Sequence, residues 1–143
     1  MKSLIFLDLN VWLALSYENH SNNEIAMAWF KKLDAATALI FCRHTQLGLL
    51  RLLSTQAVMK QDAMSEEQCW KVYDSWIESG VAFLAQEPPG LESAFRLRTK
   101  EKAPSAKQWA DGYLAAFAEA AGLTLVTFDQ ALAGMVKGAV VLS

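Results

Sequence analysis

The sequence has few cysteines and few prolines, and it lacks any long apolar run. Cys42 and Cys69 are too few for a disulfide framework and form no ligand-spaced cluster, so we expect free thiols in a reducing cytoplasm. No apolar run approaches the ~20 residues that cross a bilayer, which predicts a soluble protein outside the membrane. Asp8 and Asn10 interrupt the apolar start of the chain, and this excludes a secretory signal.

An excess of basic residues is also missing. The 13 Lys and Arg residues against 15 Asp and Glu residues give a formal net charge of -2. This balance argues against charge-driven binding of nucleic acid over a broad surface, so any contact with RNA must be local. The only histidines are His20 and His44, and without a third ligand at metal-binding spacing they predict surface or local hydrogen-bonding roles rather than a zinc site.

The apolar content, in contrast, is ample for a core. With 143 residues, 53% of them hydrophobic, residues 1–143 are expected to form a single domain. Apolar runs that are typical of buried strands alternate with amphipathic segments that are typical of helices. The expected strands are 4–7, 39–42, 81–84, 123–128 and 139–142, and the expected helices between them include 11–17, 107–121 and 130–136. This alternation predicts an α/β fold with a mainly parallel central sheet of about five strands, flanked by helices.

Several residues mark the ends of the expected helices. Thr45 is expected to cap the helix that contains Gln46, and Ser65 with Gln68 fits the spacing of a capping box. Gly80 and Gly122 are expected to end helices, because glycine accepts the left-handed conformation there.

Three aspartates stand where apolar runs meet helical segments. Asp8 follows the first expected strand, Asp129 follows the fourth, and Asp111 lies near the start of a helix. Because the carboxyl ends of parallel strands share one edge of a sheet, these carboxylates can converge. Close carboxylates repel one another, so a cation must compensate or their pKa values must rise. Mg²⁺ or Mn²⁺ is the natural partner, and either ion can activate water for phosphodiester hydrolysis.

Each of these features also has a structural interpretation. A single Asp at a helix start is more often a cap or a partner of the helix dipole than a catalytic group, whereas three at converging edges favour a site. Trp109 neighbours Asp111, but it and the other tryptophans match apolar helix stripes. We therefore expect them in the core rather than as platforms for stacked bases.

Four segments carry these residues in an order and spacing that resembles the PIN-domain ribonucleases, and specifically the VapC toxins of bacterial and archaeal toxin-antitoxin pairs. The segments are residues 7–12, 45–53, 109–118 and 125–129, and the resemblance spans nearly the whole chain. It implies a Mg²⁺- or Mn²⁺-dependent endoribonuclease with a parallel central sheet. It also implies a homodimer that a small antitoxin protein holds inactive.

The resemblance also implies roles for individual residues. Asp8, Asp111 and Asp129 match the acidic residues of the metal site, and Asn10 and Thr127 match polar positions beside that site.

Gln46 departs from the pattern, because many relatives have Glu at this position. An amide oxygen can still ligate a hard cation or orient its water, but the missing negative charge should weaken metal affinity. We therefore expect Gln46 in or beside the coordination sphere. On this hypothesis, Gln46→Glu tightens Mn²⁺ binding.

Two other functions stay open from the sequence. A haloacid-dehalogenase-like phosphatase also begins with an Asp after its first strand, but here Asn10 replaces the second acid and Trp12 the usual Thr. Hydrolysis of p-nitrophenyl phosphate would identify such an enzyme. A non-catalytic PIN-like module that binds RNA or a protein partner is favoured by Gln46 and opposed by the three aspartates. Growth inhibition that survives Asp8→Asn would support that module.

Overall fold

A computed structural model, which describes residues 3–100 and 105–143, contains a five-stranded parallel sheet at its centre. The strands are β1 (Ser3–Leu7), β2 (Thr37–Phe41), β3 (Ala82–Leu84), β4 (Thr124–Thr127) and β5 (Val140–Val141). They lie in the order β3-β2-β1-β4-β5, and each neighbouring pair is parallel. The predicted α/β fold with a parallel central sheet is therefore confirmed.

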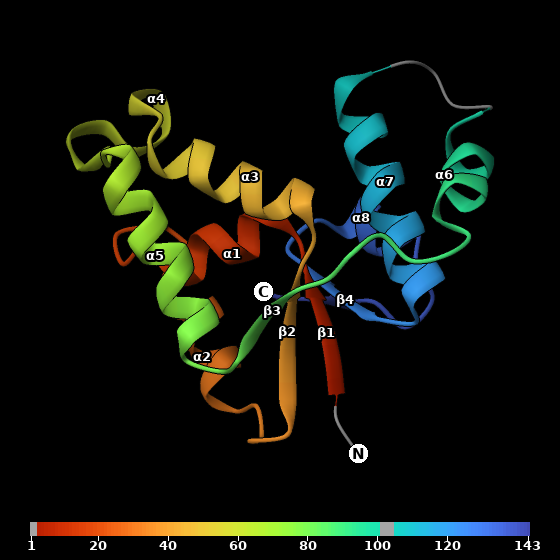
Figure 1. The fold of residues 1–143 in the computed structure, drawn as a ribbon, viewed down its shortest axis with the longest axis horizontal. Helices are drawn as coiled ribbons and strands as arrows, with labels where there is room; N and C mark the ends of the chain where they lie inside the picture. The colour runs from red at the N-terminus through yellow and green to blue at the C-terminus, as the bar shows by residue number, and fades with distance from the viewer. Residues whose placement is uncertain (1–2, 101–104) are drawn as a thin grey trace.

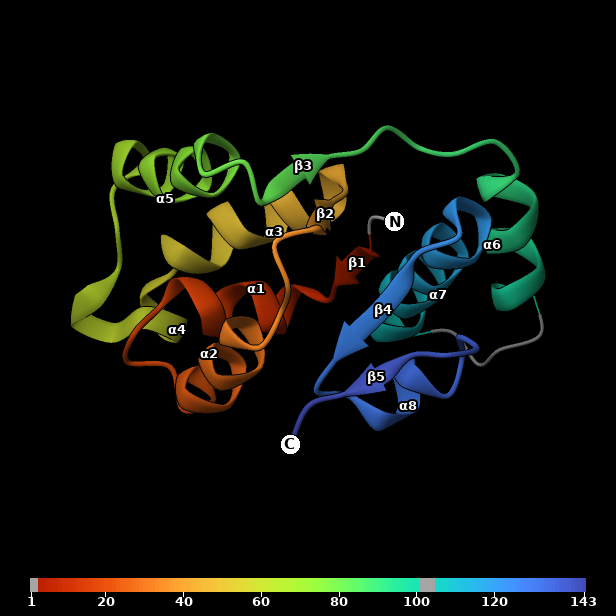
Figure 2. The same ribbon diagram turned by 90° about the horizontal axis from the view of Figure 1, so that it is seen from below.

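Helices cover both faces of this sheet (Figures 1 and 2). They are α1 (Leu9–Ser16), α2 (Asn23–Lys31), α3 (Arg43–Leu53), α4 (Gln56–Met59), α5 (Glu66–Glu78), α6 (Leu91–Thr99), α7 (Ala106–Ala121) and α8 (Gln130–Ala133), with a 3-10 turn η1 (Lys60–Asp62). Helices α1 to α5 lie on one side, and α6 to α8 lie on the other. The carboxyl ends of β1, β2 and β4 therefore lie between two groups of helices.

The core consists of two clusters, one on each face of the sheet. Consecutive strand residues point to opposite faces, so Phe6 belongs to one cluster and Leu7 to the other, and both are fully buried. Phe6 stacks on Phe117 of α7, with ring centroids 4.9 Å apart. On the other face Trp12 of α1 stacks on Phe41 of β2 at 3.7 Å. Burial on both faces explains why the strands read as continuous apolar runs.

The ends of the helices agree with the sequence in part. Ser65 and Gln68 form the predicted capping box, because each side chain accepts a hydrogen bond from the other residue's backbone N–H, at 3.2 and 2.9 Å. The prediction for Thr45 is wrong. Cys42 is the N-cap of α3, and Thr45 lies in the first turn, where its hydroxyl accepts from the Cys42 N–H at 3.0 Å. A Thr three residues after the N-cap can accept a hydrogen bond from the backbone N–H of the cap. In the sequence such a residue is therefore easily mistaken for the cap itself.

The short segment α4 with η1 was not expected, because residues 56–62 lack a clear apolar period. Helix α1 begins at Leu9, earlier than expected, since Asp8 caps it.

Candidate active site

Asp8 occupies the junction of β1 and α1, and its carboxylate is almost completely buried, with the residue 8% exposed. One carboxylate oxygen, Oδ1, accepts a hydrogen bond from the backbone N–H of Leu9 at 2.7 Å, which caps α1. The other, Oδ2, accepts from the hydroxyl of Thr127 at 2.8 Å. Because Thr127 ends β4, this bond fixes the Asp8 carboxylate across two neighbouring strands.

The pKa of Asp8 shows that the three predicted carboxylates share one electrostatic environment. Burial is the main cause that raises the pKa of this carboxyl group. The hydrogen bonds from Thr127 and Leu9 lower it, whereas the negative charges of Asp111 and Asp129 raise it further. The fold therefore brings together residues that lie more than 100 positions apart in the sequence.

Asp129 is held in place by the start of α8. Its Oδ1 accepts hydrogen bonds from the backbone N–H groups of Ala131 at 2.8 Å and Leu132 at 3.2 Å. Its own N–H donates to the Thr127 hydroxyl at 2.9 Å. Thr127 thus accepts from the backbone of Asp129 and donates to the Asp8 carboxylate. This one hydroxyl connects two of the acidic residues.

The third carboxylate, Asp111, projects from the first half of α7. Its neighbour is Lys107, one turn earlier on the same face, whose ammonium lies 3.1 Å from Asp111 Oδ2. The same ammonium forms an ion pair and a hydrogen bond with Asp129 Oδ2. This contact is the main cause that lowers the pKa of Asp129, and the two carboxylates in turn raise the pKa of Lys107.

Lys107 was not identified as a site residue from the sequence. The sequence does indicate its pairing with Asp111, because Lys107 lies four residues before Asp111 and residues at i and i+4 are neighbours on a helix surface. That spacing gives no information about Asp129, which follows in a different element.

The donors at this edge fit a hard divalent cation. They are carboxylate oxygens, and oxygen ligands suit Mg²⁺ or Mn²⁺. The charges of Asp111 and Asp129 add to the effect of burial, which is the main cause that raises the pKa of Asp8. Within the described parts of the chain, however, no three His, Cys, Asp or Glu side chains stand close enough to form a ready-made metal cluster. The ammonium of Lys107 joins two of the carboxylates instead.

Gln46 lies at the same end of the sheet but makes contacts elsewhere. Its side chain is buried, and Oε1 accepts a hydrogen bond from Arg43 Nη1 at 2.6 Å. A hydrogen bond with Gln46 also lowers the pKa of Tyr73 on α5, which burial raises. The side chain of Gln46 is thus engaged on the α5 side of α3, and the structure does not bring it into contact with the three aspartates. Asn10, in the first turn of α1, is exposed.

His44, which the sequence assigned to a surface role, lies at the rim of the acidic edge. Its pKa is lowered mainly by burial and also by Arg51, and the charge of Asp8 raises it, which places the two side chains within electrostatic reach. Its ring lies 5.8 Å from that of Tyr113 on α7.

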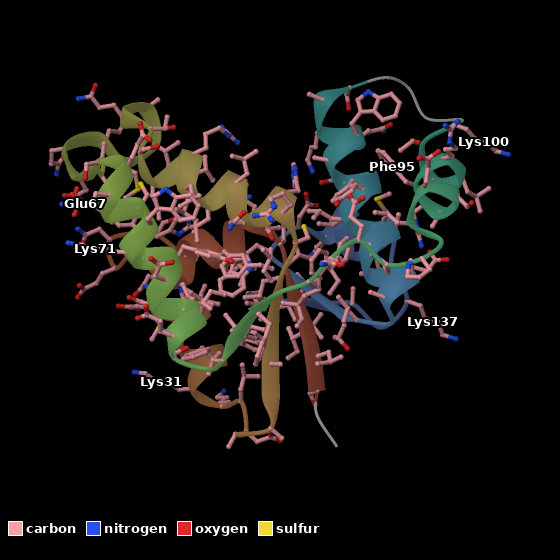
Figure 3. All side chains as sticks on the ribbon, in the orientation of Figure 1. Lys31, Glu67, Lys71, Phe95, Lys100 and Lys137 are labelled. Carbon is pink, nitrogen blue, oxygen red and sulfur yellow. The ribbon has the colours of Figure 1, made fainter. Side chains whose placement is uncertain are left out.

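The prediction that the tryptophans lie in the core is wrong for Trp109 and Trp70, which are 55% and 47% exposed. The ring of Trp109 makes a T-shaped contact with that of Phe95, which points from α6 towards α7 (Figure 3), with ring centroids 6.1 Å apart. The first turn of α7 extends beyond the sheet (Figure 1), so a side chain there does not pack on the sheet.

Known proteins resemble this chain in sequence and in fold. Residues 5–137 match the PIN domain family. The chain is 36% identical over 132 residues to Ribonuclease VapC41 of Mycobacterium tuberculosis, and the alignment covers 90% of each chain. The crystal structure of Mycobacterium tuberculosis VapC20, a sarcin-ricin loop cleaving toxin, has a TM-score of 0.64 at 16% identity and covers 91% of this chain and 93% of that one. VapBC2 from Rickettsia felis, bound to a promoter DNA fragment, gives a TM-score of 0.66 at 12% identity, with 98% and 99% covered.

Proposed function

Because this chain belongs to the PIN-domain family and is a VapC-type ribonuclease, we propose that it cleaves RNA at the edge formed by Asp8, Asp111 and Asp129. PIN-domain ribonucleases are metal-dependent, and for this chain we propose Mg²⁺ or Mn²⁺ as the ion. The observation that carries the proposal is the convergence of three carboxylates from β1, α7 and β4–α8 in one electrostatic environment.

Asp8, Asp111 and Asp129 would hold the cation. When bound, a divalent ion supplies Lewis acidity towards the phosphoryl group and lowers the pKa of a bound water, which can then attack the phosphodiester. The protein's contribution is to hold these oxygen donors in position before RNA arrives. The Thr127 hydroxyl and the Leu9 N–H orient the Asp8 carboxylate, and the first N–H groups of α8 orient Asp129.

Fixed carboxylates favour this chemistry, because little reorganisation is needed when the ion and the phosphate bind. Thr127 is a positioning residue in this scheme, since it bonds two of the acids through one hydroxyl. Asn10, two residues after Asp8, is exposed, and we propose that it meets the substrate. We propose that residues 1–143 act as one unit, as a homodimer in the cytoplasm.

The partner of a VapC-type toxin is an antitoxin protein. The similar Rickettsia felis structure is a VapBC2 assembly bound to promoter DNA, and on this likeness we propose a small cognate antitoxin for this chain. In the described residues, no helix is both long and apolar enough to span a membrane.

Cleavage of total bacterial RNA by the purified protein tests the proposal. With Mn²⁺ we expect discrete new 5′ ends that disappear with chelator. Asp8→Asn and Asp111→Asn should each reduce cleavage on the order of 100-fold. Asp74→Asn is the matched control, because it removes the same charge from the exposed face of α5 and should cleave like the wild type.

Cuts that persist in the aspartate variants would contradict this site and indicate a contaminating nuclease. Mn²⁺ binding without any cleavage would favour the alternative function, a PIN-like module that binds RNA or a partner. Light scattering should give a mass of about twice 15.8 kDa for the homodimer, and a mass near 15.8 kDa would contradict it.

A further inference from the structure

The side chain of Lys107 lies across the acidic edge and is itself largely exposed. It starts one turn before Asp111 on α7 and reaches across to α8, where it also contacts Asp129. Its ammonium thus joins two carboxylates that come from different elements and that are both partly buried, with side chains 19% and 31% exposed.

This contact alters the charge at the site. The ammonium pairs with both Asp111 and Asp129, and it lowers the pKa of Asp129. Among residues 3–100 and 105–143, in contrast, no cationic side chain pairs with Asp8, whose partners are the Leu9 N–H and the Thr127 hydroxyl. A cation that binds all three carboxylates therefore finds two of them, Asp111 and Asp129, already paired with the ammonium of Lys107.

We propose that Lys107 is an internal counter-ion of this site, which competes with the divalent cation for Asp111 and Asp129 and must leave them when the cation binds. The inference rests on the proposed function, because it assumes that these aspartates hold a metal ion. Lys107 thereby sets how tightly the metal-free enzyme takes up its ion. It also keeps the carboxylates close together in the absence of that ion.

The exposure of Lys107 makes the exchange feasible. Its side chain is 62% exposed, so the ammonium is already largely hydrated and loses only weak, screened ion pairs when it leaves the carboxylates. A long and flexible side chain can move without any change in α7. The freed ammonium would remain at the edge of the site, where it can meet a negatively charged phosphate of the substrate.

Calorimetric titration with Mn²⁺ tests this proposal directly, without a measurement of cleavage. Lys107→Met keeps an unbranched side chain of nearly the same length and removes the charge. It should lower the Kd for Mn²⁺ about 3- to 10-fold, because two partly exposed ion pairs no longer compete. Lys107→Arg restores the charge and should bind Mn²⁺ within about twofold of the wild type.

Lys137→Met is the matched control for net charge. Figure 3 shows Lys137 projecting from the lower part of the molecule, away from the end of the sheet at which β1 meets α1. Loss of this distant charge should change the Kd less than about twofold, because salt screens separated charges. If Lys107→Met binds Mn²⁺ no more tightly than Lys137→Met, the proposal is overturned.

The same titration separates this inference from the proposed function. Mn²⁺ binding that survives Asp8→Asn and Asp129→Asn would place the metal elsewhere and would refute the proposed site. A wild type and a Lys107→Met variant that both fail to bind Mn²⁺ would overturn the site and the counter-ion together. Mn²⁺ binding that requires the aspartates but has the same Kd in Lys107→Met as in the wild type would refute the counter-ion role and leave the proposed site intact.

A second readout distinguishes competition from a purely structural role. Without metal, Lys107→Met should lower the Tm by about 1–4 °C, because the carboxylates lose their counter-ion. Saturating Mn²⁺ should abolish this difference, since the metal then supplies the positive charge. A Tm deficit that persists unchanged with Mn²⁺ would show that Lys107 only stabilises the fold.

Discussion

At the scale of single residues, Asp8 combines a cost to stability with a role at the site. Burial and two neighbouring carboxylates raise its pKa, so the ionised form is held less favourably in the folded protein than in the unfolded chain. The residue nevertheless stands where three hydrogen-bonded elements meet. This is the pattern expected where function, rather than stability, selects the side chain.

Asp8→Asn should therefore stabilise the metal-free protein on the order of 1 kcal/mol at neutral pH, while cleavage is lost. An amide keeps an oxygen that can accept from the Leu9 N–H. Because the folded-state pKa of Asp8 is raised above 3.8, the penalty of its ionised form exists at neutral pH and disappears as the pH falls through that folded-state pKa. Thermal melts of both proteins between pH 3 and pH 7 measure this difference.

The increase in stability that Asp8→Asn gives at neutral pH should consequently become smaller as the pH falls. A gain that grew as the pH fell, or a variant less stable at pH 7, would contradict the raised pKa.

Asp129 should show the opposite pH dependence. Its pKa is lowered by Lys107 first and by the N–H groups of α8, so its ionised form stabilises the folded state. This contribution is present above its unfolded pKa near 3.8 and is lost as the pH falls through the lower folded-state value. We expect Asp129→Asn to lower the Tm of the metal-free protein at pH 7 and to differ little from the wild type in strong acid. Equal melting temperatures at pH 7 would contradict the pairing.

The contacts of Gln46 change what is expected of its replacement. The sequence alone suggested that Gln46→Glu tightens Mn²⁺ binding. In the structure Oε1 already accepts from Arg43, so a carboxylate there should pair with that guanidinium. We now expect the Kd for Mn²⁺ to stay within about twofold of the wild type. Calorimetry decides between the two, since a several-fold lower Kd would return Gln46 to the metal site.

At the scale of elements, the contact between α6 and α7 holds Asp111 in place. Gly112 follows the aspartate directly and faces α6, where a Cβ at this position would lie 2.5 Å from Thr99 Cγ2. The Thr99 hydroxyl is bonded to the Phe95 carbonyl at 2.8 Å, so rotation of that side chain would break a hydrogen bond. Glycine is required here for close approach of two helices, not for its backbone conformation.

Gly112→Ala should therefore destabilise the protein by about 1–2 kcal/mol, although alanine is the better helix former. Thr99→Ser removes the clashing methyl group, and the double variant should recover most of the loss. Gly134→Ala is the control, because its nearest atoms would lie at 3.5 Å, an ordinary contact. Denaturant unfolding of the variants measures these differences. A Gly112→Ala protein as stable as the wild type would show that α6 moves freely against α7.

At the scale of the whole molecule, a cation bound by Asp8, Asp111 and Asp129 should raise the stability of the folded protein. A ligand that binds only the folded state at 100 times its Kd stabilises it by about 2.7 kcal/mol. Mn²⁺ should therefore raise the Tm by several degrees, and chelator should reverse the change. Because protons compete for the same carboxylates, the shift should decrease as the pH falls through the raised pKa of Asp8. Asp8→Asn should reduce the shift, and an undiminished shift would place the ion elsewhere.

The sequence by itself determined the architecture and the three acidic positions. Apolar runs that alternate with amphipathic segments require a parallel sheet covered on both faces, and this is the observed fold. Asp8 and Asp129 follow strands β1 and β4, which pair as neighbours, so their approach follows from topology. The capping box at Ser65 is likewise a local pattern, because its two partners are three residues apart.

Only the tertiary structure decided which side chains complete the edge. The contact of Lys107 with Asp129 and the pairing of Gln46 with Arg43 depend on how each helix is rotated and how far it lies from its neighbours. A periodic pattern shows which face of a helix is buried, but it does not show which residue a polar side chain will contact. Those contacts depend on how α3, α7 and α8 pack against the sheet, because this packing brings together residues that are distant in the sequence.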